Sequence, residues 1–377
     1  MLEFRVTVRR LLIFALLSVV GSAQVAPSFA PETCLTHLAT AAVSDLADFD
    51  QDGDLDLLVI EPFTNQARIF SNVGAMPWPS GVVMTTAAGP GGARAGDFDG
   101  DGDIDFVVRC SQSQISVFLQ NGAGFLRTDQ ATGIVSSDTS IDVIDWEGDG
   151  DLDLLVSLDF VLLNDGSGNF ATASPIGFLQ IGNPPVLSFL RDLDGDGDTD
   201  YVLRKTAITS SGLVTQLVVV QASPNGLLPT VVVPDIGQIA RIGVGDFDGD
   251  GDLDLVVVST ANNAMTGTST AILQPWIQVS GFRFLPGPRQ EIPGVVIGAS
   301  PDLKVVDQDG DGRDDCWFIV VTRSGTMVTS DLRLFLGARS GTFVDSGSTL
   351  TFVNPQSRDI HAIRDLDADG RPDILST

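Results

Sequence analysis

Seven short acidic motifs place carboxylates at alternate positions, and this spacing is the clearest chemistry in the sequence. Each motif is nine residues long, as in DFDGDGDLD over 246–254, and the others begin at residues 48, 97, 145, 192, 307 and 365. Carboxylates this close repel one another unless a cation lies among them. The motifs hold 34 of the 49 acidic residues, so they predict cation sites and account for most of the formal charge of −28.

The ligand types in these motifs favour calcium. Calcium takes about six to eight oxygen ligands and accepts carboxylates together with backbone carbonyls. Side chains at positions 1, 3 and 5 converge only if the chain curls around the ion, and the glycine at position 6 permits that curl. A carbonyl at position 7 and the aspartate at position 9 would complete the cage. The motifs contain no thiolate or imidazole ligand, which disfavours zinc and copper, and magnesium prefers fewer protein ligands.

An EF-hand is a poor alternative for the same residues. That loop needs a bidentate glutamate at position 12 and a helix on each side. Position 12 is apolar in the first five motifs, and the flanking segments have the pattern of strands. The residues at this position are Val59, Val108, Val156, Leu203 and Val257.

The motifs recur every 47 to 61 residues, so the chain is built from repeats. Segments such as LDLLVI (55–60) and QARIFSN (66–72) have the pattern of buried strands, and NDGSGNF (164–170) has the chemistry of a hairpin turn. Each repeat is predicted to contain strand A, the acidic loop, strand B, strand C, a turn and strand D. Seven such units predict an all-β, seven-bladed β-propeller with its calcium loops in the A–B hairpins.

Two details of the repeat carry further expectations. Position 2 of the motif is usually large and apolar, which predicts packing between blades, whereas Gln308 breaks the pattern and predicts a looser sixth loop. Only ILST follows the seventh motif. Either the last blade is short and is closed by an N-terminal outer strand near Phe29, with roughly one strand missing, or the chain is truncated.

The N-terminus resembles an export signal. Arginines precede a short apolar core at Leu11–Val20, and small residues follow it before Gln24. We expect residues 1–23 to be a signal peptide and 24–377 to be the propeller, secreted, periplasmic or at the cell surface; an uncleaved anchor is the alternative. No other segment is predicted to span a membrane. The excess of acidic residues argues against a nucleic-acid partner, since phosphate binding needs clustered lysine and arginine.

The pattern D-x-D-x-D-G-x-x-D between two strands resembles the FG-GAP/VCBS repeat, whose calcium loops also occur in the β-propeller of integrin α-subunits. The resemblance covers about residues 25–377, and it implies up to seven calcium ions held at positions 1, 3, 5 and 9. Glu147 departs from the usual Asp or Asn at position 3. The implied ligands are Asp48, Asp50, Asp52 and Asp56; Asp97, Asp99, Asp101 and Asp105; Asp145, Glu147, Asp149 and Asp153; Asp192, Asp194, Asp196 and Asp200; Asp246, Asp248, Asp250 and Asp254; Asp307, Asp309, Asp311 and Asp315; and Asp365, Asp367, Asp369 and Asp373.

The same resemblance implies a binding, adhesion or interaction module for an extracellular protein or glycan. The alternative is a propeller-fold polysaccharide lyase or hydrolase. Candidate catalytic side chains are scarce: His361 is interpreted as a packing residue, and the others are His37 and Tyr201. We therefore assign no catalytic residue.

Extra residues in the later repeats suggest where a ligand would bind. They fall between strands B and C, at 204–214, 260–271 and 322–330, and are rich in serine, threonine and asparagine. We expect polar loops there, on the face opposite the calcium loops, and the hypothesis is that they bind the partner. Ordinary drift in loop length is the alternative.

Overall fold

The computed structural model describes residues 6–12, 28–29, 33–35, 42–73, 81–122, 124–134, 140–157, 160–172, 174–175, 186–197, 199–209, 212–221, 231–233, 238–263, 268–280, 282–295, 303–324, 327–353, 360–364, 366 and 373–376. Its described residues form strands and turns but no helix, and so none long and apolar enough to cross a membrane. The chain divides into two compact units. Unit 1 comprises Met1–Arg10, Pro31–Ile181 and Arg364–Thr377, and unit 2 comprises Leu11–Ala30 and Gly182–Ile363.

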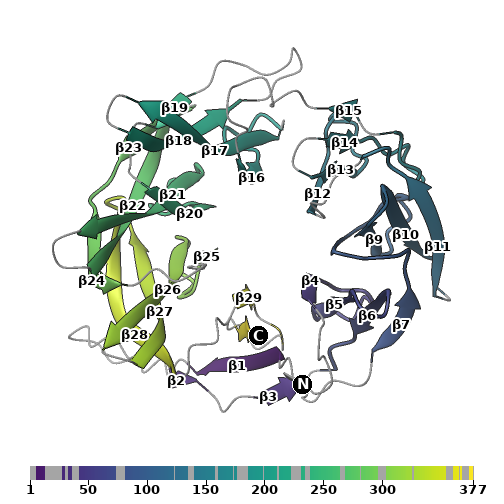
Figure 1. Ribbon diagram of the computed structural model, residues 1–377, viewed down its shortest axis with the longest axis horizontal. Coiled ribbons are helices and arrows are strands. Elements are labelled where there is room, and N and C mark those ends of the chain that lie inside the picture. Colours follow the sequence, from purple (N-terminus) through teal and green to yellow (C-terminus); the bar gives the residue numbers. More distant parts are fainter. Residues whose placement is uncertain are drawn as a thin grey trace. The chain divides into compact units, whose positions relative to one another are not determined.

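Unit 1 contains one four-stranded antiparallel sheet for each of the first three repeats (Figure 1). The sheets are β4 (Ala42–Ala47), β5 (Asp56–Glu61), β6 (Gln66–Phe70) and β7 (Val82–Thr85); β8 (Gly92–Gly96), β9 (Asp105–Cys110), β10 (Gln114–Gln120) and β11 (Phe125–Ala131); and β12 (Ile141–Ile144), β13 (Asp153–Val156), β14 (Phe160–Leu162) and β15 (Ser174–Pro175). Strands that follow one another in the sequence lie side by side, and each acidic motif joins the first two. The predicted A–B–C–D repeat is confirmed in these sheets.

The core of unit 1 lies between neighbouring sheets. Every residue of β9 is buried, as expected for a strand that is covered on both faces, whereas the edge strand β11 is mostly exposed. The position-2 residue Phe49 packs edge-on against Phe106 and Phe125 of the next repeat, at centroid distances of 6.1 and 6.2 Å. The predicted packing of position 2 between repeats is therefore confirmed here.

Strands from the two ends of the chain pair with each other. In β1 (Val6–Leu12), Val8 pairs with Leu375 of β30 (Asp373–Ser376). On its other side, β1 pairs with the short strands β2 (Ser28–Phe29) and β3 (Thr33–Leu35). The sequence predicted an outer strand near Phe29 and one missing strand. In the structure, residues predicted to belong to the export signal supply a strand between Phe29 and β30.

Unit 2 has a four-stranded sheet and a nine-stranded sheet, and its described residues end with β29 (Ile360–Arg364), which crosses into unit 1 at its last residue. The first sheet is β16 (Val186–Arg191), β17 (Asp200–Thr209), β18 (Gly212–Val220) and β19 (Val231–Val233). The second contains β20 (Gln238–Gly245), β21 (Asp254–Asn263), β22 (Thr268–Ser280), β23 (Arg283–Pro286), β24 (Gln290–Val295), β25 (Leu303–Val306), β26 (Asp315–Ser324), β27 (Met327–Ala338) and β28 (Thr342–Val353).

Where the structure describes them, the extra residues of the later repeats belong to strands, so the prediction of loops there is wrong. They lengthen three B–C hairpins, in which β17 and β18, β21 and β22, and β26 and β27 stay paired almost to their tips. Alternating β-branched and polar residues suit paired strands as well as they suit loops, which is why composition misled the prediction. The added length also lets β24 pair with both β22 and β26, so one sheet spans two repeats.

Candidate metal centre

The acidic loops curl around the carboxylate at motif position 1. In the fifth loop, Asp246 Oδ1 accepts the N–H groups of Gly249 (2.7 Å) and Asp250 (3.2 Å), and Asp246 Oδ2 accepts that of Gly251 (3.0 Å). The carboxylate therefore organises the backbone, and the position-3 and position-5 side chains follow from that curl. Equivalent carboxylates in the other described loops are Asp48, Asp97, Asp145, Asp192 and Asp307.

Two glycines in each typical loop have left-handed backbone conformations. Gly251 at position 6 has a φ of 95°, as the sequence predicted, but Gly249 at position 4 has a φ of 78° and was missed. Its signal was present, because five of the seven motifs have glycine there. In the first loop this position is Gln51, with a φ of 58°. Its side-chain amide donates to the second loop, to the carbonyl oxygen of Gly102 (3.1 Å) and to Asp103 Oδ1 (3.0 Å).

Carboxylate oxygens converge in five of the described loops, within 4.8 Å of one another. The groups are Asp48, Asp50 and Asp56; Asp97, Asp99 and Asp101; Asp192, Asp194 and Asp200; Asp246, Asp248 and Asp250; and Asp307, Asp309 and Asp311. In the fifth loop Asp248 Oδ1 is buried and has no hydrogen-bond partner among the described residues. An oxygen-only donor set with a buried, unpartnered carboxylate oxygen fits a hard cation such as calcium.

Two loops differ from this pattern. The third loop, which the structure describes in full, forms no such group, and Glu147 is the residue that departs from the repeat there. Of the seventh-motif ligands, Asp365, Asp367 and Asp369 lie outside the described residues, and Asp373 begins β30. The metal-ligand role of these residues therefore stays a prediction.

Gln308 occupies position 2 of the sixth loop, where the other motifs have an apolar residue. This side chain is buried, and its Oε1 accepts the indole N–H of Trp317 at 2.8 Å. Its backbone N–H donates to Asp315 Oδ2 (3.0 Å), as the apolar position-2 residues do in other loops. The amide oxygen thus exchanges an apolar contact for a hydrogen bond to a buried tryptophan, while the buried Nε2 has no hydrogen-bond partner among the described residues, and the looser sixth loop stays a prediction.

The aspartate at position 9 accepts hydrogen bonds from two parts of its repeat, a role that its motif alone does not predict. Asp254 is fully buried, with Oδ2 accepting the N–H of Phe247 (3.0 Å) and Oδ1 accepting that of Gln278 (2.7 Å). Each carboxylate oxygen has a further lone pair, so an oxygen that accepts one of these hydrogen bonds can still coordinate a cation. The same two-sided bonding occurs at Asp56, Asp105, Asp153 and Asp315.

Burial perturbs these carboxyl groups strongly. It raises the pKa of Asp254 and Asp315 to about 7 and that of Asp56 and Asp105 to about 6, partly offset by the backbone N–H donors. Position 3 follows the same direction, since burial and neighbouring carboxylates together raise the pKa of Asp248. Without a cation, the folded loops therefore hold protons that the unfolded chain releases.

We expect the metal-free protein to melt at a higher temperature at pH 5.5 than at pH 8. A carboxyl group whose pKa is raised by folding stabilises the fold below its unfolded value, and that stability is lost as the pH rises through about 6 to 7. Thermal unfolding in excess chelator across this range measures the effect. A melting temperature that is constant or increases toward pH 8 would contradict the burial of unpaired charge in these loops.

Two of the three candidate catalytic residues lie in the described part of the chain, and both belong to strands. Tyr201 is buried, and burial raises the pKa of its hydroxyl. His361 belongs to β29, and His37 lies outside the described residues.

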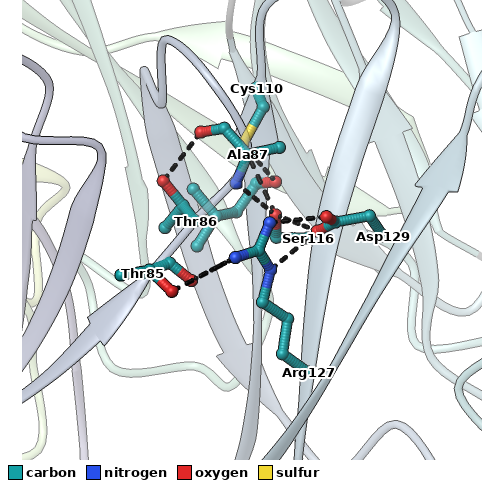
Figure 2. A network of polar contacts seen from close by, with 8 residues as sticks. Thr85, Thr86, Ala87, Cys110, Ser116, Arg127 and Asp129 are labelled. Carbon is teal, nitrogen blue, oxygen red and sulfur yellow. Dashed lines mark hydrogen bonds and ion pairs between the residues drawn. The ribbon is translucent and has the colours of Figure 1, made fainter.

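A polar network joins the first two repeats, and Figure 2 shows its side chains converging. Ser116 donates to Asp129 Oδ1 (2.7 Å) and accepts the N–H of Ala87 (2.9 Å). Arg127 donates to Asp129 and to the carbonyl oxygen of Thr85 (2.9 Å), and its hydrogen bond holds the pKa of Asp129 below the usual value. Because Ser116 is fully buried, we interpret the network as fastening the chain between the repeats rather than as a nucleophile site.

Several solved structures resemble the chain, whereas no curated protein matches it. BBS1N in complex with ARL6DN, soaked with lead, is 12% identical, with 84% of this chain and 94% of that chain covered and a TM-score of 0.35. The V. cholerae biofilm matrix protein Bap1 is 14% identical, with coverage of 89% and 66% and a TM-score of 0.33. The WD40 domain of SCAP from fission yeast is 12% identical, with coverage of 90% and 82% and a TM-score of 0.42.

The family comparison addresses the acidic repeat directly. A model of the FG-GAP-like repeat matches residues 48–108 and 97–156, each match running from one acidic motif through the strand B that follows the next motif. The matched segments begin at the first curled loop, directly after its strand A, and they contain the second and third A–B hairpins with their loops. Residues 48–156 thus contain FG-GAP-like repeats.

Proposed function

We propose that the chain is an exported, calcium-stabilised β-propeller of seven blades that serves as a binding module for an extracellular protein or glycan. One observation carries the calcium part: acidic loops of one geometry recur, with carboxylate oxygens converging within 4.8 Å in five of them. Positions 1, 3, 5 and 9 would hold the ions. Bound calcium would supply positive charge that offsets the mutual repulsion of these carboxylates.

The binding part of the proposal is supported by the three lengthened hairpins. An A–B loop and a B–C turn lie at opposite ends of an antiparallel hairpin, so the hairpin tips and the acidic loops belong to opposite ends of their sheets. Around the tips the sequence is rich in serine, threonine, asparagine and glycine. Hydroxyl and amide groups suit neutral polar ligands, which makes a glycan array the first assay.

Trimming one hairpin tests this assignment. The β17–β18 hairpin is the best target, because among the described residues no third strand pairs with its outer part. Replacing Thr206–Thr215 with Asn-Gly would place a tight turn directly after the Lys205–Gln216 pair. We expect the trimmed protein to keep its melting temperature and to lose at least about tenfold in affinity for a ligand found on the array, a loss of about 1.4 kcal/mol.

The array is read with millimolar calcium and again with excess chelator. A calcium-dependent ligand supports a folded binding module, since the ions would act through the fold. Unchanged affinity after all three hairpins are trimmed would show that the ligand binds elsewhere on the protein.

A further inference from the structure

In four of the described repeats, an amide side chain within or just after strand C reaches the acidic loop of a neighbouring repeat; in the fourth repeat, Gln221 instead donates to Asp194 of its own loop. In unit 2 the side-chain nitrogen of Gln278 donates to the carbonyl oxygen of Leu193 at 2.8 Å. Leu193 is the position-2 residue of the fourth motif, whereas Gln278 belongs to the fifth repeat. We call these side chains the amide latches; with the residue whose carbonyl they bind, they are Asn72 with Leu366, Gln120 with Phe49, Asn164 with Phe98, and Gln278 with Leu193.

The backbone of each amide latch is bonded to the acidic loop of its own repeat. The N–H of Gln278 donates to Asp254 Oδ1 (2.7 Å), and the N–H of Leu193 donates to Asp200 Oδ2 (2.8 Å). A buried path therefore runs from Asp200 through Leu193 and Gln278 to Asp254, and each of the four residues is at most 2% exposed. The other amide latches donate in the same way to Asp56, Asp105 and Asp153.

We propose that the amide latches couple the cation sites of adjacent repeats, so that filling one loop raises the affinity of the next. This inference rests on the proposed calcium sites. A cation that draws in the position-9 carboxylate fixes the backbone of position 2 and of the latch together. The next loop then has less conformational freedom to lose when its own cation binds. Hydrogen-bonded groups in a buried network also polarise one another, which strengthens the path.

The sixth repeat shows what replaces a latch. Its equivalent residue is Gly337, whose N–H donates to Asp315 Oδ1 (2.8 Å) but which has no side chain to reach the fifth loop. Asp314 joins the two loops instead: its Oδ2 accepts the N–H of Asp246 (2.9 Å), and its own N–H donates to the carbonyl oxygen of Asp246 (2.7 Å). A contact between adjacent loops is thus kept where the amide is lost.

A reporter in the fifth loop tests the coupling in the full chain. Phe247→Trp places an indole at the position that Trp146 occupies in the third loop, and terbium bound nearby then emits when the indole is excited. Terbium emission from the chain that retains Phe247 is subtracted, and the difference reports terbium bound in the fifth loop. Disabling the fourth site with Asp194→Asn should weaken terbium binding at the fifth site by about fivefold or more, the usual lower range of allosteric coupling.

The amide latch is then removed in both chains. With Gln278→Leu, disabling the fourth site should change terbium affinity at the fifth by less than about twofold, because the two sites no longer interact. The matched control is Gln274→Leu, in the same strand. Gln274 is also buried and makes two side-chain hydrogen bonds, to Gly287 and Arg289, but it contacts neither acidic loop. This control should preserve the fivefold effect.

Three outcomes would overturn the proposal. If Asp194→Asn still weakens terbium binding fivefold in the Gln278→Leu chain, the amide latch does not carry the coupling. If Asp194→Asn has no effect in the reporter chain that retains Gln278, the two sites are not coupled. The test of Asp194→Asn in the chain that retains Gln278 can be read even if Gln278→Leu does not fold. Absence of any reporter-dependent terbium emission, with no calcium bound in calorimetry, would overturn the proposed cation sites together with their coupling.

Discussion

Excess chelator is expected to lower the melting temperature of the protein by tens of degrees. Extracellular calcium modules commonly bind with Kd of about 10⁻⁴–10⁻³ M. At free calcium tenfold above Kd, one site that is absent from the unfolded chain adds about 1.4 kcal/mol, and seven sites add about 10 kcal/mol. Whole domains are stable by only about 5–15 kcal/mol, so the bound ions would decide whether the chain folds. Differential scanning calorimetry with and without chelator measures the shift.

Two controls test whether the shift in melting temperature is caused by the loss of calcium. Restoring calcium to the chelated sample should recover the original melting temperature, whereas magnesium at the same concentration should recover little of it, because magnesium retains its water and prefers fewer protein ligands. A melting curve that chelator leaves unchanged would contradict a stabilising role for calcium in the acidic loops.

Asp254→Ala is expected to destabilise the protein by about 2–6 kcal/mol even in chelator, since it leaves two buried N–H groups unpaired at about 1–3 kcal/mol each. The two donors are the backbone nitrogens of Phe247 and Gln278, both in buried residues. Chemical denaturation in chelator measures this loss separately from any lost cation. A change in the free energy of unfolding below about 1 kcal/mol would show that the two hydrogen bonds to Asp254 contribute little to stability.

Asp252→Ala is the matched control for that experiment. Asp252 occupies position 7 of the same loop, and it is exposed. Removing an exposed carboxylate of this kind should change stability by no more than about 0.5 kcal/mol. Two acidic residues of one loop, separated by a single position, thus differ in what they do for the fold.

The repeat and its loops could be predicted because their signals are local. Alternating aspartates, glycine at position 6 and apolar strands occur together within about a dozen residues of each motif, and the structure forms A–B hairpins at these places. The turn at Asn164–Phe170 was also evident, since glycines there permit the tight path that the Asn164–Phe170 bridge closes.

Features that depend on distant residues could not be predicted. The motif predicts that Asp254 is a metal ligand. Its hydrogen bond with the N–H of Gln278 joins residues that are 24 positions apart, so the motif alone cannot predict it. The amide latches are more remote still, because Gln278 and Leu193 are 85 residues apart. The strands of the long hairpins were mistaken for loops because threonine and serine are common in both.

The N-terminal residues show a conflict between two uses of one segment. Positive charge and an apolar core predict that residues 1–23 are removed on export, whereas Val6–Leu12 form a strand that pairs with β30. Short apolar, β-branched sequences suit a signal core and a buried strand equally, so the pattern cannot separate the two. N-terminal sequencing of the protein purified from the producing cells and from their medium decides between them.

The strand β24 has a consequence for how unit 2 opens. The stability of a repeat protein is approximately a sum over its repeats and the interfaces between neighbours, so unfolding can proceed repeat by repeat. Here β24 pairs with β22 of the fifth repeat and with β26 of the sixth, so backbone hydrogen bonds cross the boundary. We expect the two repeats to open as one cooperative unit, with amide protons that exchange with solvent together and more slowly than those of the separate sheet β16–β19.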